Sequence, residues 1–328
     1  MLFDCAPAPS PLVGIARLAA ESELLAAKSQ VRYFEIPARS LLNRTRPGMP
    51  FQWSINPYRG CEFGCKYCYA RYTHEFMGLE EGREFENRIY AKAGVATLLR
   101  RELRGLDPRE AIAIGTATDP YQPAERRYGR TKAILEVFLQ ERGRRLSLTT
   151  KSDLVARDIP LLAEVARRNV LSVNITITTL HTRLARLLEP RAPRPDLRLA
   201  AVRALADAGI CVGVFPNPVL PYLTDSVRSL DRLARAARAA GAGYFGGGSL
   251  FLMPAAQNVF FPFLEQRLPR LARPYRELYR KGAYLSADYK QALAERVREV
   301  RARHGLASAP LDYRPELWEG EEQGALFS

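Results

Sequence analysis

The sequence predicts an α/β fold in which strands and helices alternate along the chain. Short apolar runs rich in β-branched residues recur from about residue 51, and amphipathic stretches with helical spacing lie between them. Regular alternation of strand and helix is typical of a parallel sheet. Six such strands are too few for a closed eight-stranded barrel. We therefore expect a partial (β/α)6 TIM-like barrel, with an open doubly wound sheet as the alternative.

The expected elements follow one another in a regular order. The strands are Phe51–Ile55, Ala111–Thr116, Leu146–Thr150, Leu171–Thr178, Ile210–Phe215 and Gly243–Leu252. The intervening helices are expected over Val95–Leu103, Ile134–Leu139, Leu161–Val165, Leu197–Leu205 and Val227–Leu233. Capping signals support the last two helices, because Asp196 and Gly209 are placed to begin and end one, and Ser226 and Gly241 bracket the other.

Two further segments flank the barrel domain, which we expect over residues 51–252. Residues 1–50 are predicted to form an N-terminal helical leader, with a helix over Val13–Gln30, that packs outside the main domain. Residues 253–328 are predicted to form a C-terminal helical extension that ends in an acidic tail. Its parts are two Arg-rich helices and a loop-like end: about Pro262–Lys281, Ala287–His304, and the residues from Ala309 on.

Composition narrows the class of protein. The chain has 328 residues, of which 47% are apolar, and this supplies enough material for a sizeable core. No apolar run approaches the roughly 18 residues that a membrane span needs. The first residues, Met1–Cys5, lack the basic and apolar regions of a secretory signal, so we expect a cytoplasmic protein without a membrane partner.

The net charge of +14 comes almost wholly from arginine, since only seven residues are lysine. Arginine binds phosphate groups with two hydrogen bonds and stacks on bases, which points to nucleic acid as a partner. The alternative interpretation is that arginine and alanine fill solvated helix faces in a protein from a GC-rich genome. Charge bears on association and not on fold, so both interpretations stay open.

Three of the five cysteines form a cluster with the spacing C-x3-C-x2-C, at Cys61, Cys65 and Cys68. The odd total makes a disulfide framework unexpected. Three thiolates in a tight loop suit a soft metal or an iron–sulfur cluster. Gly60 and Gly64 allow the backbone to curl around such a centre with positive φ.

The number of cysteines separates the kinds of metal site. A structural zinc site needs four ligands, whereas a four-iron cluster held by three cysteines leaves one iron open to a substrate or cofactor. Two alternatives remain: a zinc site with His74 as the fourth ligand, and a purely structural iron–sulfur cluster. The three histidines, His74, His181 and His304, form no recognisable catalytic triad, which argues against hydrolytic acid–base chemistry.

The cysteine spacing, with Tyr67 directly before the last cysteine, resembles the signature of radical S-adenosylmethionine (SAM) enzymes. The sequence on both sides of the cysteines, and two later stretches, resemble the spore photoproduct lyase-like (SPL-like) branch of that superfamily. The matching stretches are Asn56–Gly60, Cys68–Arg71, Gly115–Pro123 and Thr150–Ser152. The resemblance implies a 4Fe-4S cluster on the three cysteines and SAM on the open iron. It further implies reductive cleavage of SAM to a 5′-deoxyadenosyl radical that abstracts hydrogen from a substrate, with an electron donor such as flavodoxin or ferredoxin.

Polar residues near the ends of the expected strands are candidates for SAM contacts, because active sites of α/β barrels lie at that edge. The resemblance implies that a group among Thr116, Thr118 and Asp119 meets the SAM amino group; the alternative is an ordinary turn. It also implies that Lys151 contacts the SAM carboxylate. Ser172 and Asn174 are candidates for polar contacts to SAM, or they bond to each other across strands.

Arg191 is a further candidate, for a carboxylate or ribose contact, with a solvated arginine as the alternative. One departure from the lyase concerns the cysteine with which that enzyme returns a hydrogen atom to its substrate. The matching position, within Gly115–Asp119, is a threonine, whose O–H bond is too strong for this role. Cys211 or a tyrosine is a conceivable replacement.

We therefore expect a monomeric radical SAM enzyme that acts on nucleic acid or a nucleotide. A peptide or small-molecule substrate is the first alternative, and a non-catalytic metal-binding module that grips nucleic acid is the second.

Overall fold

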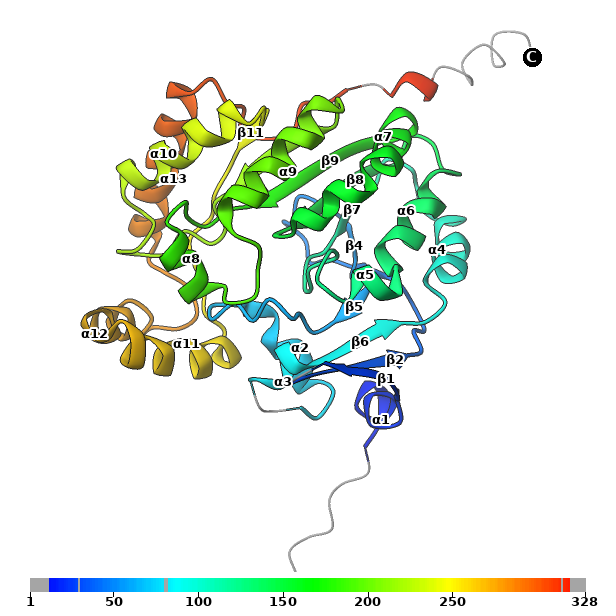
Figure 1. Cartoon of the computed structure of the whole chain (residues 1–328), viewed down its shortest axis with the longest axis horizontal. Helices are drawn as coiled ribbons and strands as arrows, with labels where there is room; N and C mark the ends of the chain where they lie inside the picture. Colours follow the sequence, from blue (N-terminus) through cyan, green and yellow to red (C-terminus); the bar gives the residue numbers. More distant parts are fainter. Residues whose placement is uncertain (1–11, 29, 80–81, 314, 319–328) are drawn as a thin grey trace, which may run out of the picture.

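A seven-stranded sheet forms the centre of the protein (Figure 1). The computed structural model describes residues 12–28, 30–79, 82–313 and 315–318. The strand order is β11-β10-β9-β8-β7-β4-β3, in which the first six strands are parallel and β3 is antiparallel. The strands are β3 (Leu42–Arg44), β4 (Trp53–Ile55), β7 (Ala111–Ile114), β8 (Arg145–Thr150), β9 (Val170–Thr176), β10 (Cys211–Phe215) and β11 (Tyr244–Phe245).

These strands confirm the six that the sequence predicts, in the predicted order. Their apolar, β-branched residues are buried; Val173 and Ile175 of β9, for example, are 0% exposed. The last predicted strand is much shorter than expected, because after Phe245 a run of three glycines continues as loop. The result is an α/β fold with a mixed sheet.

Helices connect the parallel strands and follow one another around the outside of the sheet in Figure 1. They are α4 (Val95–Leu103), α5 (Glu125–Tyr128), α6 (Arg130–Phe138), α7 (Ile159–Arg168), α8 (Thr182–Leu188), α9 (Pro195–Asp207) and α10 (Val227–Ala239), with a 3-10 turn, η2 (Asp153–Asp158), before α7. A large apolar core fills the space between sheet and helices. Among the described residues, no helix is long and apolar enough to cross a membrane.

The predicted helix caps are right in three cases and wrong in one. Ser226 accepts a hydrogen bond from the Ser229 amide at the start of α10. Gly209 and Gly241 follow α9 and α10 with positive φ, as expected for residues that end helices. Asp196 is not the cap of α9, because Pro195 already occupies the first helical position and the helix begins there.

The leader is not helical throughout, so the predicted helix over Val13–Gln30 is wrong beyond its first turns. It contains α1 (Gly14–Ala20) and then two antiparallel strands, β1 (Glu23–Lys28) and β2 (Val31–Ile36). With β6 (Arg88–Lys92) and β5 (Tyr58–Arg59) these form a second sheet in the order β1-β2-β6-β5. Strand pairing here outweighs the helix propensity of the Leu- and Ala-rich β1. Residues 1–11 of the leader lie outside the described residues.

The C-terminal extension contains three helices where the sequence predicts two. They are α11 (Pro254–Arg267), α12 (Pro269–Leu278) and α13 (Ala287–Arg303), so the helix expected over Pro262–Lys281 is in fact split near Leu268. A proline at the first position of α11 and of α12 fixes where each begins. Helix α13 confirms the other expected helix. Of the loop-like acidic end, residues 309–313 and 315–318 are described, and they include the short turn η3 (Glu316–Trp318).

Candidate active site

One loop, Cys61–Cys68, carries the three clustered cysteines. It follows β5 and leads into η1 (Tyr69–Arg71) and the short helices α2 (Tyr72–Glu75) and α3 (Glu84–Asn87). Its side chains share an apolar cluster with the C-terminal helices, and α11 packs directly on η1 and α2. The loop is thus enclosed between the large sheet and the C-terminal extension.

Two glycines give the loop its shape. Gly60 and Gly64 have φ of +78° and +63°, the left-handed region that the sequence analysis anticipated. A Cβ at Gly60 would lie 2.7 Å from the Arg88 carbonyl oxygen, and one at Gly64 would overlap Glu86 Oε2. Both positions therefore require glycine for space as well as for backbone conformation.

Replacing Gly64 by alanine is expected to destabilise the fold more than the same change at Gly94. Both glycines have a similar positive φ, but a Cβ at Gly94 meets nothing within 4 Å. The conformational strain of about 1–2 kcal/mol is common to both variants, and the clash with Glu86 adds roughly 1–3 kcal/mol at Gly64 alone. Urea unfolding monitored by circular dichroism measures the difference. Equal losses in the two variants would mean that Glu86 does not restrain the loop.

The three cysteines are unpaired and little exposed. Cys61 and Cys65 are 9% and 8% exposed, Cys68 is partly buried, and none forms a disulfide. Burial raises the pKa of all three thiols, that of Cys65 to about 12, and neighbouring negative groups add to the effect at Cys61 and Cys65. Thiols in this setting need a positively charged partner, such as a metal centre, to become thiolates.

A single metal ion fits this loop poorly. In the described part of the chain, no three His, Cys, Asp or Glu side chains are grouped so as to hold one ion. Thiolates that each bind a different iron of a cluster lie further apart than thiolates that share one ion. His74, the alternative zinc ligand, is buried against Phe85, and its Nε2 lies 3.1 Å from the Arg88 carbonyl oxygen. The zinc alternative is therefore not favoured.

The other two histidines have separate structural roles. His181 Nδ1 accepts a hydrogen bond from the Leu184 amide at the start of α8, and His304 Nε2 lies 3.0 Å from Asp231 at the end of α13. The expectation that the histidines form no catalytic triad is in keeping with these contacts.

Side chains after β7 hold the first half of the loop. Thr118 Oγ1 donates to the Gly60 carbonyl oxygen at 2.6 Å. Gln122 Nε2 donates to the same oxygen at 3.0 Å, and Gln122 Oε1 accepts from the Glu62 amide at 3.0 Å. Thr118 thus positions the loop backbone, whereas any role toward SAM stays a prediction.

A buried ion-pair cluster supports the second half of the loop. Arg71 Nη2 donates to the Cys65 carbonyl oxygen and to Glu86 Oε1, at 2.9 Å in both cases. Glu86 also pairs with Lys66 at 3.8 Å and with Arg191 at 3.2 Å. Arg191 therefore binds the carboxylate of Glu86. The sequence analysis expects Arg191 to contact a carboxylate or ribose, and that contact stays a prediction.

A second buried network ties Tyr67 to the region after β9. The Tyr67 hydroxyl donates to Glu189, which also accepts a hydrogen bond from Thr178 Oγ1 at 2.7 Å. Arg198 Nη2 pairs with Glu189 at 2.5 Å, and both side chains are 1% exposed. Burial alone raises the pKa of Glu189, but Arg198 and Lys151 outweigh it, so the pKa is held below its ordinary value.

Asp119 links two neighbouring strand ends. Its Oδ1 accepts hydrogen bonds from Thr150 Oγ1 at 2.6 Å and from the Tyr121 amide at 2.9 Å, and its Oδ2 accepts from the Lys151 amide at 2.7 Å. Burial raises the pKa of this carboxyl, although these hydrogen bonds oppose the shift. The contacts match the turn interpretation, and a contact to the SAM amino group remains a prediction.

Thr116 follows β7 and Lys151 follows β8, the two strands whose ends Asp119 connects. Thr116 Oγ1 accepts a hydrogen bond from Asn56 Nδ2 at 3.1 Å, and its carbonyl oxygen accepts one from Tyr69. Lys151 Nζ lies 5.9 Å from the centre of the Tyr67 ring and makes no ion pair with any described carboxylate. Its ammonium group faces the cysteine loop, and its charge acts on both Cys65 and Cys68. Lys151 is therefore available to an anionic group beside the loop.

Ser172 and Asn174 each bond to residues of other strands, but not to each other as the alternative interpretation expects. Asn174 Nδ2 donates to Ser147 Oγ at 2.9 Å, and Asn174 Oδ1 accepts from the Tyr244 hydroxyl at 2.6 Å. Ser172 Oγ lies 3.5 Å from the Leu146 carbonyl oxygen, on the adjacent strand β8. These groups satisfy one another inside the sheet, and a contact to SAM stays a prediction for both.

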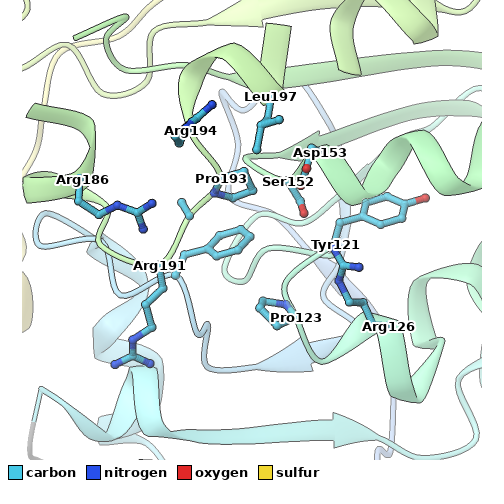
Figure 2. Close-up of a pocket in the computed structure, with 12 residues that line it drawn as sticks. Tyr121, Pro123, Arg126, Ser152, Asp153, Arg186, Arg191, Pro193, Arg194 and Leu197 are labelled. Carbon is cyan, nitrogen blue, oxygen red and sulfur yellow. The ribbon is translucent and has the colours of Figure 1, made fainter. Parts of the chain in front are cut away.

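An open cavity of about 570 Å³ lies beside the cysteine loop, at the edge where β7, β8 and β9 end (Figure 2). Phe63, which lies between Cys61 and Cys65, contributes to its wall. Four arginines and a single carboxylate also line it: Arg126, Arg186, Arg191, Arg194 and Asp153. The cavity is thus strongly basic.

Sequence reasoning missed the residues that support the loop from behind. Glu86, Gln122 and Glu125 are buried, and Glu125 accepts hydrogen bonds from Tyr58 and from the amides that begin α6. Gln122 lies within Gly115–Pro123, one of the stretches that resemble the lyase-like branch. This is the one signal in the sequence that could have identified it. Glu86 and Glu125 look like ordinary surface charges until the fold buries them.

Comparisons with known proteins identify relatives of this chain. An uncharacterized protein of Mycobacterium tuberculosis (Rv2578c) is 39% identical over 288 residues, which cover 87% of this chain and 84% of that protein. An uncharacterized protein of Methanocaldococcus jannaschii (MJ0683) is 30% identical over 202 residues, covering 60% of this chain and 71% of that protein.

Solved structures share the fold. A structure of spore photoproduct lyase complexed with dinucleoside spore photoproduct has a TM-score of 0.63 at 18% identity, and the match covers 84% of this chain and 80% of that one. Streptococcus suis SuiB bound to S-adenosylmethionine has a TM-score of 0.52 at 16% identity, with 82% and 52% covered. The family model of the radical SAM superfamily matches residues 55–234, more than half of the chain. The chain therefore belongs to the radical SAM superfamily and is a radical SAM enzyme.

Proposed function

We propose that Cys61, Cys65 and Cys68 bind a 4Fe-4S cluster and that SAM binds at the iron without a cysteine ligand. The observation that carries this proposal is the set of three unpaired cysteines on one loop whose glycines cannot be replaced without a clash. Membership of the superfamily implies an iron–sulfur cluster and SAM. When bound, the two groups supply one-electron cleavage of SAM to methionine and a 5′-deoxyadenosyl radical.

The protein's own residues orient and shield these groups. Buried side chains enclose the loop and exclude water, which protects a radical from side reactions. Arg71 and Thr118 fix the loop backbone through the carbonyl oxygens of Cys65 and Gly60. The Lys151 ammonium forms no ion pair with a described carboxylate, although its charge lowers the pKa of Glu189, and we expect it to attract the SAM carboxylate.

We further propose that the large sheet is a partial (β/α)6 barrel. In support, six parallel strands run from β4 to β11, and their connecting helices lie outside them. The cysteine loop then lies at the carboxyl edge of the barrel, where α/β barrels carry their active sites. The residues proposed to meet SAM lie at that edge, and those of β9 lie within the sheet beneath it.

Nucleic acid or a nucleotide is the substrate class that we propose, on the strength of the +14 charge and the shared fold. The reaction differs from that of the lyase in its hydrogen donor, because threonine stands where the lyase has cysteine. Cys211 is a poor substitute donor. It begins β10, so it lies at the amino edge of the parallel sheet, opposite the cysteine loop.

Anaerobic reconstitution with iron and sulfide tests the proposal. The loaded protein, reduced in the presence of SAM, should form 5′-deoxyadenosine. A fully loaded cluster that gives no such product would contradict the radical function. Binding of a single-stranded oligonucleotide at several salt concentrations tests the substrate class, since neutralising Z phosphates gives a slope of about −0.7Z in log Kobs against log salt. A flat response would exclude nucleic acid.

Replacing Lys151 by methionine is expected to weaken SAM binding roughly 10- to 100-fold, because a hydrogen-bonded charge pair contributes about 1.5–3 kcal/mol. Iron content should not change, since Lys151 is not among the proposed ligands. Equilibrium dialysis of the reconstituted protein with labelled SAM measures the affinity. Lys132→Met, an exposed lysine on α6, is the matched control. Equal affinities in the two variants would remove Lys151 from the SAM site.

A further inference from the structure

Two positively charged side chains in the second sheet have no partner. Lys92 ends β6 and is only 6% exposed, and Arg59 on β5 is partly buried. Neither side chain forms a hydrogen bond or an ion pair within the described residues. A buried charge is costly unless it is paired, so such groups in proteins normally have a partner of opposite charge.

The register of the strands places these two side chains near each other. Arg59 lies opposite Tyr90 in the antiparallel pair of β5 and β6, and Lys92 is two residues beyond Tyr90. Residues two apart on a strand point to the same face, so Arg59 and Lys92 are diagonal neighbours on one face of the sheet. Diagonal neighbours lie about 7–8 Å apart, which long side chains can span. Burial and the charge of Arg59 lower the pKa of Lys92 to about 8.

The carboxylates in this region have other partners. Glu102 is the carboxylate whose charge acts on Lys92, but its oxygens accept hydrogen bonds from two backbone amides next to the start of β3, at 2.8–3.2 Å. Arg88 is the other cation diagonal to Arg59, and it pairs with Glu84 at 3.2 Å. The described carboxylates therefore leave Arg59 and Lys92 without a counterion.

We propose that Arg59 and Lys92 form a binding site for a phosphate group. A phosphate monoester carries a charge of about −1.5 to −2 at pH 7, which matches two cations. Arginine binds phosphate through two parallel hydrogen bonds, and lysine binds it as a point charge. Arg59 is partly exposed, so the anion can reach the pair from solvent. The two side chains recognise the phosphate group itself, whether it is free or part of an organic molecule.

This site is separate from the residues proposed to hold the cluster and SAM. Neither Arg59 nor Lys92 is among those residues, and neither lines the cavity beside the cysteine loop. Arg59 does precede Gly60, whose carbonyl oxygen accepts hydrogen bonds from Thr118 and Gln122. A phosphate bound to Arg59 therefore stabilises the strand that enters the cysteine loop. The inference goes beyond the proposed function and holds whether or not the loop carries a cluster.

Binding of inorganic phosphate to the metal-free protein tests the proposal. Isothermal titration calorimetry at pH 7 should show one site in the wild-type protein. Phosphate should also raise the free energy of unfolding measured in urea, because a ligand that binds only the folded state stabilises it. Sodium chloride at the same ionic strength is the control for general screening and should do neither.

Three variants assign the binding to this pair. Lys92→Met should weaken phosphate binding roughly 10- to 100-fold, the factor expected for one hydrogen bond to a charged group. It removes a buried charge that has no partner, so the variant should fold as well as the wild type. Lys92→Arg keeps the charge and should retain binding. The matched control is Arg32→Met, which removes an exposed cation from the same face of the sheet and should bind phosphate as the wild type does.

Comparison with glycerol 3-phosphate and adenosine 5′-monophosphate identifies the source of the phosphate. Tighter binding of either ester than of inorganic phosphate supports a phosphorylated organic ligand, and tighter binding of inorganic phosphate supports the free ion. Equal stabilisation by chloride, or full phosphate binding by Lys92→Met, would overturn the proposal. If none of the three phosphates binds, Lys92 is buried as a neutral amine and the pair is not an anion site. Formation of 5′-deoxyadenosine tests the proposed function separately from all these outcomes.

Discussion

Replacing Cys65 by alanine is expected to abolish formation of 5′-deoxyadenosine and to reduce iron retention by more than 100-fold. Even residues that only support metal ligands cost about 10- to 100-fold in affinity when mutated, so loss of a direct ligand should exceed that range. Cys65 has no disulfide partner, and its environment raises the pKa of the thiol, so the metal-free protein does not need it as a charged group. The measurements are iron and sulfide content after reconstitution, and product formed with dithionite and SAM.

Cys211→Ala is the matched control for this variant. It removes the same thiol from a partly buried position at the opposite edge of the sheet, so iron content and product should equal those of the wild type. A Cys65→Ala protein that keeps a full cluster and full activity would show that the loop does not hold the iron. Equal losses in both variants would indicate a general effect of cysteine removal on folding.

The sequence predicts the large sheet well because its signals are local. Each of the six strands is a short apolar run, and each connecting helix has an apolar face, so strand order follows directly from chain order. The helix predicted in the leader is wrong for the opposite reason, because the structure there depends on distant residues. Residues in β1 favour a helix by propensity, and only pairing with β2, which in turn pairs with the distant β6, makes them a strand.

The candidate site also has a part that local sequence signals reveal and a part that only the fold reveals. The cysteine loop is visible in the sequence because spacing and glycines lie within eight residues of one another. Its supports are not visible, because Glu86 and Glu189 are brought to the loop from other parts of the chain. A buried carboxylate and a surface carboxylate look alike in a sequence, and only the fold reveals which arginine each one faces.

Polar residues on strands show a further limit. Asn174 interrupts an apolar strand, and such a residue is a sensible candidate for a ligand contact. In the structure its amide bonds to Ser147 and Thr149 on β8, and its oxygen bonds to Tyr244, whose ring covers Gly213. Satisfaction of buried polar groups by one another is the commoner outcome in protein interiors. Periodicity alone does not separate the two outcomes.

Replacing Arg198 by methionine is expected to lower the free energy of unfolding by about 3–5 kcal/mol, because the buried charge of Glu189 loses its ion-pair partner. The hydrogen bonds from Tyr67 and Thr178 remain, but neither donor carries a charge. The side chains of Arg198 and Glu189 are both 1% exposed, so water cannot substitute for the lost guanidinium group. The matched control is Arg194→Met, which breaks the exposed pair with Asp196 and should cost less than about 1 kcal/mol. Urea unfolding of the metal-free protein measures both values.

The double variant Arg198→Met/Glu189→Leu separates charge from packing. It removes both charges, so it should recover much of the stability lost in Arg198→Met. The pH dependence provides an independent check. Because the folded-state pKa of Glu189 lies below its ordinary value, its stabilising contribution is complete above the ordinary carboxyl pKa and is lost as the pH falls through the folded-state pKa. The stability gap between wild type and Arg198→Met should therefore narrow in acid. If the difference in free energy of unfolding stays constant down to the pH at which the protein unfolds, the lost stability comes from packing of the arginine stem. The Tyr67–Glu189–Arg198 network would then be held by packing and not by charge.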